Sequence, residues 1–223
     1  MLNIQPRLPT IPDLFPIAAD ERVTIVGSSG SGKSYGAASL LRYQKRVLIF
    51  DTKGSKSLER DGYHIIENED DLQYMGWKMY KDDTFIFRPN PFLSREEIHD
   101  LADRVCRFVY TNGNMILYVD EGMHVTTPTR APDMLHALAT RGRERGAGLW
   151  LASQRPKQIP MILLSEANHF FVFSLRLEAD RKRIDEVSEF PITREVANLK
   201  KREFMYINPD RDRLTGPHHF QTV

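Results

Sequence analysis

The sequence is short of several features, and each shortage excludes a class of protein. Its 223 residues contain one cysteine, Cys106, so an internal disulfide and a cysteine-based zinc site are both excluded. Its apolar runs are all shorter than the roughly 18–20 residues that a membrane-spanning helix needs. The N-terminus lacks the basic segment and apolar stretch of a signal peptide. We therefore expect a soluble, intracellular protein with no transmembrane segment of its own.

A large excess of charge of one sign is also missing. The chain has 31 Lys and Arg against 30 Asp and Glu, which gives a net charge of +1. Total charge therefore does not predict a polyanionic partner, although residues 141–157 form a local basic stripe that could bind phosphates or simply face solvent. Hydrophobic residues make up 41% of the chain, enough for a folded core, so a mostly disordered protein is excluded.

The pattern along the chain predicts one α/β domain with short additions at both ends. Residues 1–20 contain four prolines and suit an extended arm, residues 21–210 form the domain, and residues 211–223 form a tail. Within the domain, apolar strands alternate with helices, which is typical of a mostly parallel sheet flanked by helices. The expected strands are 22–26, 47–50, 84–87, 115–119, 149–152, 170–173 and 204–207, and the expected helices are 33–43, 94–110, 131–141 and 180–187.

A glycine-rich turn follows the first strand and opens the first helix. Residues 27–34 read GSSGSGKS and match the pattern G-x-x-x-x-G-K-[ST] of a phosphate-binding loop. Its glycines let backbone N–H groups approach the phosphates of ATP, and Lys33 would bridge the β- and γ-phosphates. The predicted nucleotide-binding residues are Gly27, Ser28, Ser29, Gly30, Ser31, Gly32, Lys33, Ser34 and Tyr35.

Two acids end the apolar strand at residues 115–119. An acid at the carboxyl end of a parallel strand lies beside the phosphate site, so Asp120 would hold Mg²⁺ together with the Ser34 hydroxyl. Glu121 would polarise the attacking water as a general base. A glutamate at this position favours hydrolysis over phosphate transfer by a small-molecule kinase.

A third apolar strand, at residues 149–152, is flanked by arginines and by a polar residue. Gln154 follows the strand and could contact the γ-phosphate or the attacking water. Arg143 and Arg145 precede it, and an arginine near a subunit boundary can neutralise transition-state charge on a neighbouring subunit. The spacing alone does not choose between these two arginines, and a solvated or DNA-facing surface is the other interpretation.

Together these motifs resemble the FtsK–HerA superfamily of DNA-pumping ATPases. The resemblance covers about residues 20–210 and is most specific in GRERGAGLWLASQRP, residues 142–156. It also includes residues 27–34, DTKG at 51–54 and VDE at 119–121. It implies a RecA-like (ASCE) P-loop fold, Arg143 as the finger that acts on the neighbouring subunit, with Arg145 as runner-up, and Gln154 as the sensor. It further implies a homo-oligomeric ring, a pentamer or hexamer, with double-stranded DNA in its pore.

A core of this size is similar to the genome-packaging ATPases of viruses. We therefore expect a motor that packages a viral genome at the virion assembly site in the host cytoplasm, with a portal or capsid-vertex protein as a further partner. The alternatives are a membrane-associated assembly or secretion ATPase of the filamentous-phage morphogenesis type, and a nucleotide-dependent switch with weak turnover. Candidate contacts to the DNA backbone are Lys53, Lys56, Arg155 and Lys157.

Overall fold

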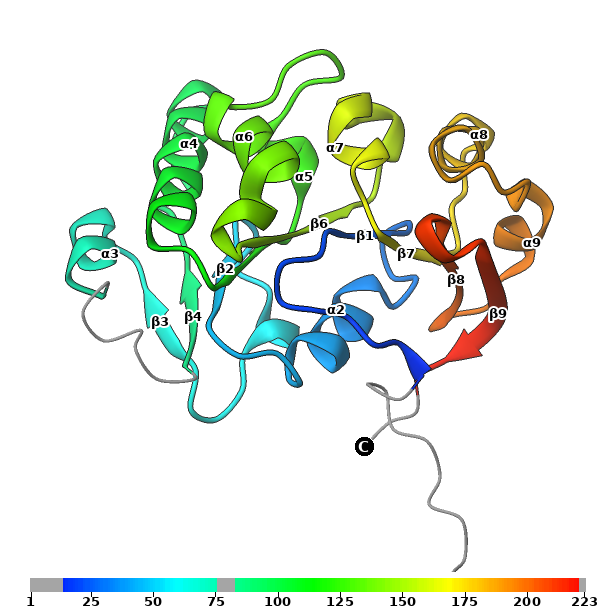
Figure 1. The fold of residues 1–223 in the computed structure, drawn as a ribbon, viewed down its shortest axis with the longest axis horizontal. Coiled ribbons are helices and arrows are strands. Elements are labelled where there is room, and N and C mark those ends of the chain that lie inside the picture. The colour runs from blue at the N-terminus through cyan, green and yellow to red at the C-terminus, as the bar shows by residue number, and fades with distance from the viewer. Residues whose placement is uncertain (1–13, 76–82, 221–223) are drawn as a thin grey trace, which may run out of the picture.

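A nine-stranded sheet runs through residues 14–75 and 83–220, which the computed structural model describes (Figure 1). Its strands are β1 (Val23–Val26), β2 (Val47–Phe50), β3 (His64–Ile66), β4 (Thr84–Phe87), β5 (Ile116–Val119), β6 (Gly148–Ser153), β7 (His169–Phe173), β8 (Glu203–Asn208) and β9 (Arg213–His219). Their order is β3-β4-β2-β5-β6-β1-β7-β8-β9. The first seven in this order are parallel, and β8 and β9 are antiparallel to their neighbours. The predicted α/β class with a mostly parallel sheet is confirmed.

The central strands are apolar along their whole length because both faces of the sheet are covered. Every residue of β1, β2, β4, β5, β6 and β7 is buried. In β7, Phe170 and Val172 pack into one layer, whereas Phe171 and Phe173 pack into the opposite layer. Because these six strands are parallel, their carboxyl ends meet at one edge of the sheet, where α/β proteins bind ligands.

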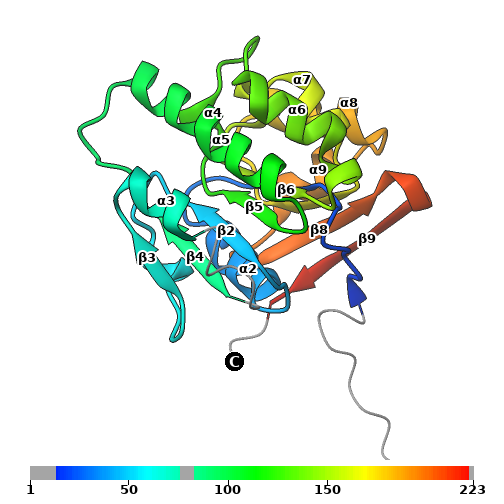
Figure 2. The same ribbon diagram turned by 60° about the vertical axis from the view of Figure 1, so that its left-hand side comes forward.

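Helices cover the two faces of the sheet unequally. They are α2 (Lys33–Leu41), α3 (Glu69–Met75), α4 (Arg95–Asn112), α5 (Gly122–Val125), α6 (Asp133–Arg141), α7 (Met161–Ser165), α8 (Glu178–Ser188) and α9 (Thr193–Asn198). Figure 1 shows α4, α5, α6 and α7 above the sheet and α2 below it, and Figure 2 shows α4 and α6 side by side. The lower face therefore needs further cover beyond α2.

The sequence predicts the buried apolar strands and the longer helices better than the exposed strand β9 and the short helices. All seven predicted strands and all four predicted helices form, with ends shifted by no more than two residues. Helix α4 begins as expected: the Ser94 hydroxyl accepts a hydrogen bond from the Glu97 backbone N–H, and the Glu97 carboxylate accepts one from the Ser94 N–H. The short strand β3 and the short helices α3, α5, α7 and α9 are missed, because so few residues show no clear periodicity. Strand β9 has seven residues but is missed because it has no apolar run and contains Gly216 and Pro217. Among the described residues, no helix is long and apolar enough to cross a membrane.

The C-terminal region differs from the expected tail at residues 211–223. Strand β9 lies within it and pairs with β8, so the sheet continues almost to the end of the chain. Gly216 and Pro217 argue against a strand in the sequence, but β9 is at the edge of the sheet, where proline is tolerated. Beyond it, Phe220 is buried and stacks on Phe204 with ring centroids 4.5 Å apart.

The arm at the N-terminus supplies the missing cover of the lower face. Residues 1–13 of the predicted arm lie outside the described residues, but Phe15 is 4% exposed and packs over β7 and β8. Its ring centroid is 5.4 Å from that of Phe171 and 4.8 Å from that of Tyr206. Phe15 and Phe220, which lie near the two ends of the described chain, thus belong to one aromatic cluster.

This packing predicts that Phe15→Ala destabilises the fold by about 3 kcal/mol or more, the usual cost of removing a buried phenylalanine. The free energy of unfolding in urea measures the effect. Phe92→Ala is the matched control, because Phe92 is 92% exposed in the loop before α4, and it should change stability by less than about 0.5 kcal/mol. Equal effects of the two substitutions would contradict the assignment of the arm to the core.

Candidate active site at the carboxyl edge of the sheet

The turn between β1 and α2 is fixed to the ends of the strands on either side. The Gly27 N–H donates to the Ser153 carbonyl at 3.2 Å, and the Ser28 N–H donates to the Ser174 carbonyl at 2.8 Å. At the start of α2, Gly32 has a φ of 109°, and a Cβ there would lie 2.9 Å from Arg202 Cα. Glycine is required at this position by both its backbone conformation and the close approach of Arg202.

The turn presents groups suited to a polyphosphate. Lys33 is only 5% exposed, and the buried Ser31 hydroxyl has no hydrogen-bond partner among the described residues. Burial lowers the pKa of Lys33 below its usual value, the Lys53 ammonium lowers it further, and Asp120 and Glu121 raise it. The start of α2 adds backbone N–H groups and the positive end of the helix dipole, so an anion bound here would relieve the repulsion between the two lysines.

The two acids after β5 are almost completely buried, and each oxygen of both carboxylates has a partner. Asp120 accepts hydrogen bonds from the Tyr118 hydroxyl at 2.9 Å and from the Ser55 hydroxyl at 2.8 Å. Glu121 Oε1 accepts from the Ser153 hydroxyl at 3.0 Å and from the Gln154 N–H at 2.9 Å. Burial and the nearby carboxylates raise the pKa of Tyr118, which keeps its hydroxyl a proton donor to Asp120. The acids are therefore held rigidly.

The site offers ligands that suit Mg²⁺. Magnesium prefers oxygen ligands and is usually bound by one or two protein groups together with phosphates and waters. Asp120 supplies a carboxylate whose oxygens each keep a second lone pair beside the hydrogen bonds they accept. Ser34 supplies a hydroxyl at the first turn of α2. The predicted pair of ligands fits a magnesium–nucleotide complex in its chemistry.

A tight turn after β2 brings two more side chains to these acids. The buried Asp51 carboxylate accepts hydrogen bonds from the backbone N–H groups of Lys53 at 3.2 Å and Ser55 at 2.8 Å, and pairs with Arg88 Nε at 2.9 Å. The turn is thereby fixed to β4 as well as to β2. From it, Lys53 Nζ lies 2.5 Å from Glu121 Oε2, and the Ser55 hydroxyl reaches Asp120.

The sequence alone does not assign these residues to the site. Lys53 is predicted as a DNA contact, whereas the structure pairs its ammonium with the predicted general base. The sequence pattern indicates no chemical role for Asp51 or Ser55. The feature that brings them to the site is the order of the strands. Because β2 and β5 are adjacent parallel strands, the residues that follow them meet at one edge of the sheet. The sequence gives the strands but not their order in the sheet.

Gln154 lies where the motif predicts, next to the acids. It follows β6, which pairs with β5, and its backbone N–H holds Glu121. Its side chain is half-buried at the same edge. Any displacement of Glu121 would thus be transmitted to the end of β6 through the chain at Gln154.

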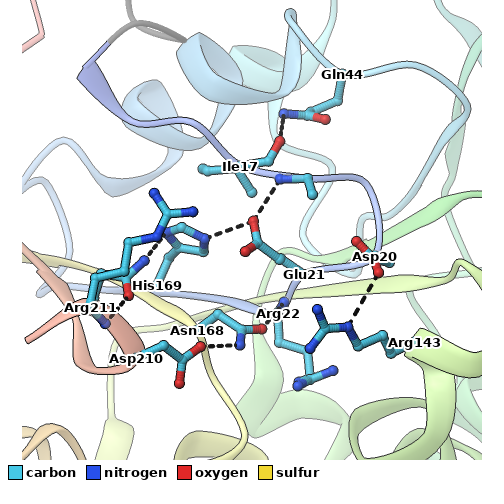
Figure 3. A network of polar contacts seen from close by, with 12 residues as sticks. Ile17, Asp20, Glu21, Arg22, Gln44, Arg143, Asn168, His169, Asp210 and Arg211 are labelled. Atoms are coloured by element: carbon cyan, nitrogen blue, oxygen red, sulfur yellow. Dashed lines mark hydrogen bonds and ion pairs between the residues drawn. The ribbon is translucent and has the colours of Figure 1, made fainter.

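The predicted finger arginines lie at the other end of β6. Arg143 and Arg145 belong to the short 3₁₀ turn Gly142–Arg145 at the amino edge of the sheet. Figure 3 shows Arg143 facing Asp20 of the arm, with Nε 3.5 Å from Asp20 Oδ2. The Arg143 side chain is 67% exposed, and the Arg145 guanidinium lies over the Tyr110 ring. Since β6 rises about 17 Å along its six residues, neither arginine is placed to serve the phosphate loop of its own subunit.

Of the remaining predicted DNA contacts, Arg155 is paired with a buried carboxylate, whereas Lys56 and Lys157 are exposed. Arg155 Nε forms an ion pair with the buried Asp180 at 2.9 Å, and the same carboxylate accepts a hydrogen bond from the Lys157 backbone N–H. Arg155 therefore anchors α8 to the turn after β6. The Lys56 and Lys157 side chains both belong to exposed residues.

The fold and this site together define a P-loop nucleotide hydrolase with a RecA-like core. The features that define it are a glycine-rich turn between a central parallel strand and a helix, and two acids at the end of a strand in the same sheet. The predicted fold class is confirmed by solved P-loop ATPases with the same architecture.

Comparison with known proteins shows which P-loop ATPases this chain is similar to. No family model matches the chain. The DNA packaging ATPase P9 of Enterobacteria phage PRD1 is 26% identical over 166 residues, which cover 74% of this chain and 68% of that protein. A probable DNA double-strand break repair helicase HerA of Methanocaldococcus jannaschii is 28% identical over 111 residues, but these cover only 22% of that protein and 43% of this chain. The predicted relationship to FtsK–HerA superfamily ATPases, on the viral packaging side, is confirmed.

The solved structures agree on the fold. The genome packaging NTPase B204 of Sulfolobus turreted icosahedral virus 2, in complex with sulfate, has a TM-score of 0.74 at 17% identity and covers 93% of this chain and 100% of its own. The same protein with an ATP analogue, AMPPCP, has a TM-score of 0.72. The conjugation coupling protein TcpA of pCW3 has a TM-score of 0.56 at 15% identity, with 86% of this chain covered.

The geometry predicts different losses for Lys33→Ala and Glu121→Gln. Lys33→Ala should abolish ATP binding because it removes the buried cation of the phosphate loop. Glu121→Gln should leave binding within a few-fold but lower hydrolysis at least about 100-fold, as removal of a general base does. Fluorescent ATP binding and steady-state ATPase rates separate the two. Loss of binding in Glu121→Gln would instead make that residue a structural support.

Proposed function

We propose that this chain is an ATP-hydrolysing motor that translocates double-stranded DNA and packages a viral genome into a procapsid. The observation that carries the proposal is the similarity to the phage DNA packaging ATPase, which extends over 166 residues. A HerA-type helicase among the relatives also supports DNA as the cargo. The site supplies the groups that such a motor needs for hydrolysis.

In the proposed hydrolysis, each group at the carboxyl edge has one role. Lys33 and the N–H groups of the turn hold the terminal phosphates, which fixes the γ-phosphate in front of the acids. Glu121 accepts the proton of the attacking water, and Gln154 orients that water or contacts the γ-phosphate. When bound through Ser34 and Asp120, Mg²⁺ supplies positive charge that neutralises the phosphate oxygens.

The proposed ring completes this site from a second subunit. Arg143 lies at the amino edge of the sheet, whereas the phosphate loop lies at the carboxyl edge. A head-to-tail ring is a closed heterologous assembly in which two different surfaces of the subunit meet. In the proposed ring, the amino edge of one subunit would face the carboxyl edge of the next. Arg143 would then neutralise transition-state charge on its neighbour, with Arg145 as the runner-up.

Further partners follow from the proposed packaging role. The ring would be a pentamer or hexamer around the DNA, and a portal or capsid-vertex protein would dock it at the virion assembly site in the host cytoplasm. The relatives do not favour the alternative of a membrane-associated phage assembly or secretion ATPase. For the DNA contact we retain the exposed Lys56 and Lys157, because Lys53 and Arg155 are engaged with buried carboxylates.

The ring predicts that Arg143→Ala subunits inhibit their neighbours. Mixed with wild-type subunits at a constant total concentration, they should lower the ATPase rate more than in proportion to their fraction. Arg145→Ala in the same series shows which arginine has the larger effect. A strictly proportional loss for both would exclude a finger that acts between subunits.

If the chain is a DNA motor, long double-stranded DNA should stimulate its ATPase rate. This stimulation should disappear as the salt concentration rises. Replacing Lys56 and Lys157 together by alanine should make the plot of log apparent DNA affinity against log salt concentration less steep. The slope should change by about one for each of the two cations that contacts a phosphate. Lys182→Ala, on the exposed side of α8, is the control and should change nothing. A rate unaffected by DNA at low salt would count against translocation by this chain alone.

A further inference from the structure

The Lys53 ammonium occupies a position that the roles proposed above do not explain. It lies 2.5 Å from Glu121 Oε2, and its side chain is 24% exposed, compared with 1% for Glu121. Its charge also reaches Lys33, whose pKa it lowers. Two lysines from different strand ends therefore converge beside the same pair of acids.

The contact covers the part of Glu121 that hydrolysis needs. Oε1 of Glu121 is held by the Ser153 hydroxyl and the Gln154 N–H. Oε2 is thus the oxygen left to accept the proton of the attacking water, and it is paired with Lys53. For Glu121 to act as a base, this ammonium has to move away or share the oxygen with water.

The backbone at Lys53 is fixed, but its side chain is long enough to change partners. The hydrogen bonds from the Lys53 and Ser55 N–H groups to Asp51 hold the turn, and Arg88 in turn holds Asp51. A lysine side chain has four rotatable methylene groups and three donors on a compact charge, so it can swing between neighbouring anions without moving the backbone. A terminal phosphate held by Lys33 would be the strongest new anion within its reach.

We propose that Lys53 is a second lysine for the γ-phosphate, which neutralises Glu121 in the nucleotide-free site and transfers its ammonium to the phosphate when ATP binds. The transfer frees Glu121 Oε2 for the attacking water and places a positive charge where charge develops in the transition state. Hydrolysis is thereby coupled to occupancy of the site, because Glu121 stays paired until a phosphate arrives. The inference rests on the proposed ATP hydrolysis but is independent of DNA as the cargo.

The test compares Lys53→Met, Lys53→Arg and Lys182→Met in the full chain, first without DNA and then with long double-stranded DNA. In Lys53→Met, kcat should fall about 100-fold, as it does when one donor to transition-state charge is lost, while affinity for a non-hydrolysable ATP analogue stays within a few-fold. Affinity for ADP with aluminium fluoride, a mimic of the transferring phosphate, should fall far more than affinity for the analogue. Lys53→Arg should recover part of kcat, and Lys182→Met, an exposed lysine on α8, should leave every value unchanged.

Three outcomes would overturn the inference. If Lys53→Met keeps its basal kcat but loses stimulation by DNA, then Lys53 is the DNA contact that its sequence position suggested. If kcat rises, the lysine only restrains Glu121 and does not serve the phosphate. If analogue binding and the urea unfolding free energy fall together, in Lys53→Arg as well, its role is structural. A wild-type chain that hydrolyses no ATP would instead refute the proposed function itself.

Discussion

Three carboxylates lie almost completely buried where the parallel strands end, and the rest of the site depends on how their charge is satisfied. Burying an unpaired carboxylate costs several kcal/mol, so Asp51, Asp120 and Glu121 each require fixed partners. Those partners come from the ends of β2, β4, β5 and β6 and from the turns that follow them. This requirement fixes the turns relative to one another and holds Asp120 and Glu121 rigidly at the edge of the sheet that also carries the phosphate loop.

The same requirement explains why Lys53 pairs with Glu121. An acid placed to activate water is a buried negative charge, and Lys53 neutralises it from within the chain. Lys33, in the phosphate loop, is a buried positive charge, and burial lowers its pKa. A nucleotide phosphate changes both balances at once, because it pairs with the lysines and exposes the acid. The exchange of partners among Glu121, the two lysines and the phosphate is therefore a natural link between binding and hydrolysis.

The amino edge of the sheet has its own polar network, which joins the segment before β1 to β7, to the turn after β8 and to Arg143 (Figure 3). Glu21, which directly follows the arm, hydrogen-bonds the buried His169 of β7, whose other ring nitrogen contacts the Tyr206 hydroxyl of β8. Burial lowers the pKa of His169, which favours a neutral imidazole in this network. The neighbouring Asp20 pairs with Arg143. The segment that covers the aromatic face thus also contacts the arginine proposed to reach the next subunit.

The sequence alone determined the buried apolar strands, the longer helices, the phosphate loop, and the acids that end β5, because each is a local pattern with a local physical cause. It also indicated the superfamily through residues 142–156. Only the tertiary structure decided which strand ends are neighbours, and so brought Lys53 to Glu121 and separated Arg143 from the phosphate loop. It also turned part of the expected tail into β9. Strand order depends on packing between residues far apart in the chain, which no local periodicity records.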